Sequence, residues 1–148
     1  MNMNTQGFAR VMGWLFLLVG IFGFIPGFVQ DPYPGAPSLA VHTGYGYLLG
    51  LFPVNVLHNL VHVGIGLWGL SAAGAFDTAR LFARGLAVFY GLLAIMGLIP
   101  GMNTMFGLVP IFGHDVWLHA ATAAVAAYFG FGQAAGIGIE EERWRKAS

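Results

Sequence analysis

Four long apolar runs, separated by polar or Pro/Gly-rich segments, dominate this chain of 148 residues. They cover residues 8–28, 54–73, 81–100 and 116–133. Each is close to the roughly 20 apolar residues that a helix needs to cross a bilayer. Only 8% of the residues are charged, whereas a soluble domain typically carries about 25%. The sequence therefore predicts an all-α membrane protein with four transmembrane helices.

The basic residues predict how this protein is oriented in the membrane. They lie near the N-terminus, between the second and third runs, or after the fourth run: Arg10, Arg80, Arg84, Arg143, Arg145 and Lys146. Because Lys and Arg concentrate in cytoplasmic loops, we expect both termini to be cytoplasmic. We predict a multi-pass membrane protein. Residues 1–139 would form a single domain, and residues 140–148 a charged cytoplasmic tail.

The chain repeats itself. The segment Gly50–Pro53 ends nine residues before His62, and the similar segment Gly107–Pro110 ends nine residues before His119. The first and third runs also resemble each other at both ends. We infer a duplicated helical hairpin, so that the first two runs and the last two form parallel repeats related by an axis along the membrane normal.

The repeat places a pair of metal-capable side chains at the start of the second and fourth runs. His58 and His62 are four residues apart, as are Asp115 and His119, so each pair shares one helix face. Ionisable groups within a span usually face the bundle interior. Helix bundles hold metals with such pairs on facing helices. Three imidazoles and one carboxylate suit zinc, iron or copper.

Neighbouring polar residues could support these ligands, and other interpretations remain open. Asn55, Asn59 and Thr122 share the same helix faces and could orient the imidazole rings by hydrogen bonds. Alternatively, His58 and His62 could be a hydrogen-bonded pair that specifies helix packing, and Asp115 could cap the fourth helix, where the helix dipole favours a negative charge. In a further alternative, His62 and His119, the equivalent residues of the two repeats, would bind a haem or a chlorophyll-type pigment from opposite sides.

The segments Gly50–Asn59, Gly107–Pro110 and Trp117–His119 also carry a family resemblance. They resemble small bacterial four-helix membrane proteins that are known only as a domain of unknown function. The resemblance covers about residues 7–132 and implies the four-helix fold in a bacterial inner (plasma) membrane, without an activity. By helix number and size alone, the chain is also loosely similar to the DoxX-like proteins, which are associated with quinone and thiol redox chemistry.

These observations predict a membrane protein that binds a transition metal or metallo-cofactor near the outer face of its bundle. One alternative is a non-enzymatic structural or accessory subunit of a larger membrane complex, which could contain pigments or redox groups. Another is a small quinone-linked membrane oxidoreductase. The expected partners are the lipid bilayer and either other subunits or further copies of the chain. The sequence contains no Ser/His/Asp arrangement, phosphate loop or basic run suited to nucleic acid, and it leaves open whether the protein is an enzyme.

Overall fold

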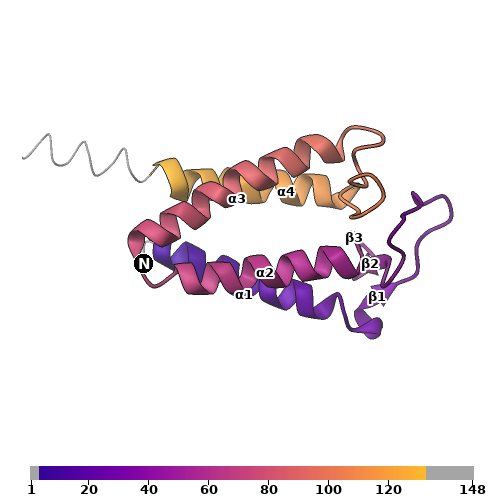
Figure 1. The fold of residues 1–148 in the computed structure, drawn as a ribbon, viewed down its shortest axis with the longest axis horizontal. Coiled ribbons are helices and arrows are strands. Elements are labelled where there is room, and N and C mark those ends of the chain that lie inside the picture. The colour runs from indigo at the N-terminus through magenta and orange to yellow at the C-terminus, as the bar shows by residue number, and fades with distance from the viewer. Residues whose placement is uncertain (1–3, 133–148) are drawn as a thin grey trace, which may run out of the picture.

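Helices form most of the computed structural model, which describes residues 4–132. The main elements are α1 (Thr5–Phe22), α2 (Val56–Ala72), α3 (Phe76–Gly97) and α4 (His114–Ala127), and α4 continues into a short π-helix, η2 (Tyr128–Gly132). α1 packs against α2, and α3 packs against α4, so the chain forms two helical hairpins (Figure 1). The hairpins contact each other mainly through α1 and α3.

A small antiparallel sheet lies at one end of the bundle (Figure 1). Its strands are β1 (Val29–Gln30), β2 (Gly46–Leu48) and β3 (Phe52–Val54), and they pair in that order. A tight turn joins β2 to β3, with positive φ angles of 54° at Leu49 and 72° at Gly50. The prediction of an all-α fold was therefore wrong for the segment between the first two helices.

Two helix boundaries differ from the apolar runs for local reasons. α1 ends at Phe22 rather than residue 28, and Pro26 begins a separate 3-10 helix, η1 (Pro26–Phe28). The residue before a proline is disfavoured in the α conformation, and Ile25 is extended. α3 begins at Phe76 rather than residue 81, with the acidic Asp77 in its first turn, where the helix dipole favours a negative charge.

Two of the described helices can cross a membrane by length and composition, α1 with 18 residues and α3 with 22. α2 is apolar but has 17 residues. Large apolar side chains are exposed on all four helices, for example Leu18, Leu67, Leu81, Leu92 and Trp117. Extensive exposed apolar surface marks contact with a membrane or with another protein. Both features indicate membrane association, while four transmembrane helices and the repeat symmetry stay predictions.

Aromatic side chains join the two hairpins at the end opposite the sheet. The rings of Phe8 and Phe129 stack with their centroids 4.6 Å apart, and Phe82 is fully buried beside them. Arg80 and Arg84 each donate a hydrogen bond from Nε to the carbonyl of Gly130, at 3.2 and 2.9 Å. Basic side chains therefore lie at this end. The predicted charged tail (140–148) and the last residue of the predicted fourth run lie outside the described residues.

Candidate metal centre

Asn55 fixes the start of α2 and connects it to loops from both hairpins. Its side-chain Oδ1 accepts a hydrogen bond of 3.0 Å from the backbone N–H of His58 and so caps the helix. Its Nδ2 donates to the carbonyl of Val41 at 3.1 Å and to that of Leu108 at 2.7 Å. Asn55 is completely buried, and it positions the backbone beneath the first histidine rather than contacting an imidazole directly.

His58 comes in the first turn of α2 and is buried between the two hairpins. Its ring lies against the backbone of Pro53 and of Pro110. Its Nδ1 has no hydrogen-bond partner, and it lies 3.8 Å from Oδ2 of Asp115.

The structure brings His58, Asp115 and His119 together. One potential ligand atom from each of the three residues lies within 4.8 Å of the others. Their exposed fractions are 4%, 2% and 2%. Nδ1 of each histidine and Oδ2 of Asp115 are buried without a hydrogen-bond partner. We call these three residues the His/Asp cluster.

His62, the fourth predicted ligand, lies next to the His/Asp cluster but is not among its three residues. Its ring stacks on Phe16 with the centroids 5.4 Å apart, and it lies 4.5 Å from the ring of His58. Its Nδ1 is also buried without a hydrogen-bond partner. His62 therefore forms one wall beside the cluster, with its ring held by an aromatic contact from α1.

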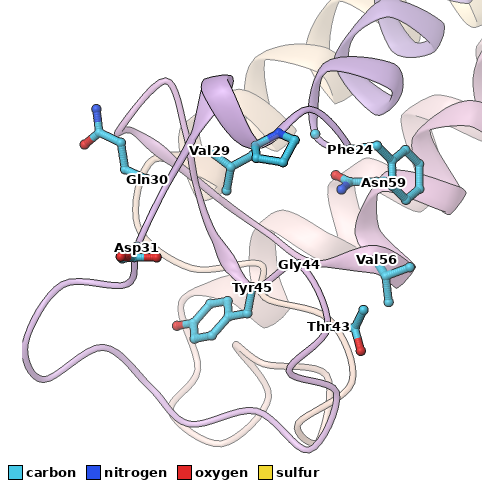
Figure 2. Close-up of a pocket in the computed structure, with 11 residues that line it drawn as sticks. Phe24, Val29, Gln30, Asp31, Thr43, Gly44, Tyr45, Val56 and Asn59 are labelled. Carbon is cyan, nitrogen blue, oxygen red and sulfur yellow. The ribbon is translucent and has the colours of Figure 1, made fainter.

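The other two residues predicted to orient the ligands line separate cavities. Asn59 is buried, and neither its Nδ2 nor its Oδ1 has a partner. It contributes to a cavity of about 380 Å³ between the end of α1, β1 and the start of α2 (Figure 2). That cavity contains no member of the His/Asp cluster. Thr122 lines a second cavity of about 210 Å³, which does contain Asp115 and His119.

Sequence reasoning missed the aromatic side chains around the cluster. Tyr90 of α3 is buried, and its ring makes an edge contact with His119 at a centroid distance of 5.0 Å. Its position in the middle of a predicted span was the available signal, because a hydroxyl inside a membrane needs a partner. Phe16 had no such signal, since its apolar ring is ordinary in any span.

His42 and His114, the remaining described histidines, are exposed.

Two imidazoles and one carboxylate can bind a divalent transition metal and leave coordination positions free. Ligand atoms that share one ion at about 2.0–2.2 Å are about 3–4 Å apart. The separation of 3.8 Å between His58 Nδ1 and Asp115 Oδ2 falls within this range. At the same time, 3.8 Å is too long for a hydrogen bond. The separation of this pair thus suits a shared ion better than a direct bond, and the limit of 4.8 Å for all three ligand atoms means that His119 would have to move by less than about 1 Å to complete the set.

Comparisons with known proteins add a family but no activity. Residues 6–132 match the family described as Domain of unknown function (DUF4383). No curated protein and no solved structure matches the chain.

Proposed function

We propose that this chain, which belongs to the DUF4383 family of unknown function, binds a divalent transition metal within a bundle of membrane helices. The ligands would be His58, Asp115 and His119. One observation carries the proposal: these three side chains are buried within 4.8 Å of one another, and each has a ligand-capable atom without a hydrogen-bond partner.

The energetics of burial favour a metal over a purely structural polar group. A buried polar atom without a partner costs about 1–3 kcal/mol, and more when it is charged. A hydrogen-bonded structural network would remove this cost through direct bonds, yet His58, Asp115 and His119 make none with one another through the unpartnered atoms. A divalent ion would satisfy all three side chains at once and would balance the carboxylate charge.

A bare ion fits the available space better than a haem or chlorophyll-type pigment. The cavity that contains His62 and His119 has a volume of about 210 Å³. A cavity of about 150 Å³ accommodates a single benzene ring. A macrocycle with four pyrrole rings needs several times that volume. Zinc, iron and copper all accept two imidazoles and a carboxylate, and the free coordination positions would be available to water or to a further ligand.

A membrane setting is also part of the proposal. Four helices would cross the bilayer, with both termini in the cytoplasm and the His/Asp cluster towards the outer face. The position of Arg80 and Arg84 at the end opposite the sheet supports this orientation, because basic residues concentrate on the cytoplasmic side. The exposed apolar side chains of the helices would then contact lipid.

Metal analysis of the purified full chain in lipid nanodiscs tests the proposal. The chain would be dialysed against zinc, copper or, without oxygen, ferrous iron, and the bound metal measured by mass spectrometry. We expect about one ion per chain, lost in His119→Ala and Asp115→Asn. His114→Ala is the matched control, because His114 is an exposed histidine adjacent to Asp115 in the sequence, and it should retain the metal.

Two results would contradict metal binding. The first is a well-folded wild-type protein that takes up none of the three metals. The second is equal metal content in the wild type, His119→Ala and Asp115→Asn. If the variants lose only stability and the wild type binds no metal, the His/Asp cluster is a structural polar group.

A further inference from the structure

Two arginines of α3 share one backbone acceptor in η2, at the end of the bundle opposite the sheet (Figure 1). Arg80 and Arg84 are four residues apart in α3, so they lie on the same helix face. Both donate from Nε to the carbonyl oxygen of Gly130, at 3.2 and 2.9 Å. Because both bonds end at the same oxygen, the two guanidinium groups lie side by side. We call Arg80 and Arg84 the arginine pair.

The contacts of η2 hold the arginine pair in place. The backbone of Gly130 packs directly on α3, since a Cβ atom at this residue would lie 2.9 Å from Cγ of Arg84 and 3.0 Å from its backbone nitrogen. Cζ of Arg84 also lies 5.1 Å from the centroid of the Phe131 ring, within the range of a cation–π contact. Side chains fixed in this way lose less conformational freedom when a ligand binds.

Most of the donors of the arginine pair remain available. A guanidinium group carries five N–H donors, and each arginine uses its Nε–H on Gly130. Within residues 4–132, the Nη atoms of Arg80 and Arg84 make no hydrogen bond to another side chain or to the backbone. These Nη groups form the planar fork that binds a phosphate or a carboxylate through two parallel hydrogen bonds.

The positive charge of the arginine pair is not balanced within the described part of the chain. Residues 4–132 contain three acidic residues, and two of them, Asp31 and Asp115, lie towards the sheet. The third, Asp77, is exposed in the first turn of α3, and it makes no ion pair with either arginine. The glutamates at 140–142 lie outside the described residues. An arginine in a membrane helix is costly without a partner, so an anion from elsewhere is favoured.

The position of the arginine pair along α3 suits the headgroup layer of a bilayer. Arg80 and Arg84 follow Phe76, the first residue of α3, by four and eight residues, which places their Cα atoms about 6 and 12 Å along the helix axis. Side chains of a helix lean towards its N-terminus, so both arginines extend towards the start of α3. In the proposed orientation this is the cytoplasmic surface.

Exposed apolar side chains border the arginine pair. Leu81 follows Arg80 on α3 and is 64% exposed, and Phe131, which contacts Arg84, is 50% exposed. A ligand that combines a phosphate with a hydrocarbon chain can use both the donors and this apolar surface. A soluble phosphate ion can use only the donors. The combination therefore favours a phospholipid.

We propose that the arginine pair binds the phosphate of an anionic phospholipid in the cytoplasmic leaflet, with the acyl chains along Leu81 and Phe131. The inference rests on the membrane setting of the proposed function and is independent of the metal. Gly130 fixes the direction of the two guanidinium groups, and the lipid phosphate supplies the anion that residues 4–132 do not provide at this place.

Mass spectrometry of intact protein–lipid complexes tests this inference. The full chain in a neutral detergent is titrated with dioleoyl phosphatidylglycerol, which is anionic, or with dioleoyl phosphatidylcholine, which has the same acyl chains and no net charge. We expect the wild type to bind the anionic lipid with an affinity about tenfold higher. Soluble glycerol 3-phosphate in excess should not displace the bound lipid.

The variants Arg80→Gln and Arg84→Gln should each lower the preference for the anionic lipid about threefold, and the double variant should remove it. Arg10→Gln is the matched control, because Arg10 is an exposed arginine near the start of α1, at the same end of the bundle, that has no bond to Gly130. It should retain the preference. Circular dichroism should show the same helical signal for all these variants.

Three results would overturn the lipid site. The first is a wild type that binds both lipids equally, which decides the matter whether or not the variants fold. The second is an equal loss of preference in Arg10→Gln and in the folded double variant, which would indicate a general charge effect. The third is displacement of the lipid by glycerol 3-phosphate, which would assign the arginine pair to a soluble phosphate.

The metal content of the same samples separates this inference from the metal proposal. If the wild type binds metal but shows no preference for the anionic lipid, the lipid site is wrong and the metal site stands. If the wild type binds no metal but shows a preference that the arginine variants remove, the metal proposal fails and the lipid site stands.

Discussion

Replacing Gly66 by alanine should destabilise the bundle, because α1 and α2 approach each other closely at this residue. A Cβ atom at Gly66 would lie 2.6 Å from the backbone nitrogen of Leu17 and 2.9 Å from the carbonyl oxygen of Gly13. Both atoms belong to the main chain of α1, so they cannot move aside by a side-chain rotation. Overpacking of this kind typically costs about 1–3 kcal/mol.

Gly64→Ala provides a control on the same helix. A Cβ atom at Gly64 meets nothing within 4 Å, so this variant changes the helix propensity alone. Alanine favours a helix over glycine by about 0.5–1 kcal/mol, and both variants share this gain. The difference between their free energies of unfolding therefore isolates the steric effect, which we expect to be about 1–3 kcal/mol, with Gly66→Ala the less stable.

Unfolding in mixed micelles, driven by increasing amounts of a denaturing detergent, measures this difference. Circular dichroism would follow the helices, and tryptophan fluorescence would follow the packing. A neutral substitution usually changes the free energy of unfolding by no more than about 0.5 kcal/mol. If the free energies of unfolding of the two variants differ by less than this, α1 and α2 do not approach each other closely at Gly66.

Three further predictions concern the capping of α2, proton competition and the topology. Asn55→Asp keeps the capping oxygen but removes the donor to Val41 and Leu108, so it should lower the free energy of unfolding by about 1–3 kcal/mol, measured in the same assay. The bound metal should decrease as the pH is lowered, because imidazole and carboxylate ligands must be deprotonated to bind an ion; constant metal content at all pH values that preserve the fold would contradict ligation. Reporter fusions at the C-terminus and within residues 32–38 should report opposite sides of the membrane, and the same side for both would refute the topology.

The positions of the helices and the meeting of three site residues could be predicted from the sequence. Apolar runs of about 20 residues mark helices by length alone. The helical period put His58 on one face of its run and placed Asp115 and His119 together on one face of theirs. The structure brings these three side chains within 4.8 Å of one another. The periodicity within each helix gives the shared face, and the tendency of ionisable groups in a span to face the bundle interior predicts that the two faces meet.

The sheet and the place of His62 depend on contacts between distant residues. Val29 pairs with Leu48, and strands of two or three residues are too short to show an alternating pattern. The 100° rotation per residue gives the face on which His62 lies, but it does not give the relative depth of two packed helices. His62 therefore contacts Phe16, although its sequence pattern equally suited a ligand.

The hydrogen bonds of Asn55 impose an order on the assembly of the protein. One of its acceptors, the carbonyl of Leu108, lies 53 residues further along the chain, and Asp115 and His119 come later still. At about 5–20 residues per second of synthesis, Leu108 follows Asn55 from the ribosome by about 3–10 s. During this interval, the amide of Asn55 and the imidazole of His58 lack their partners from the second hairpin. The His/Asp cluster is thus completed only when the second hairpin docks, however early the first one enters the membrane.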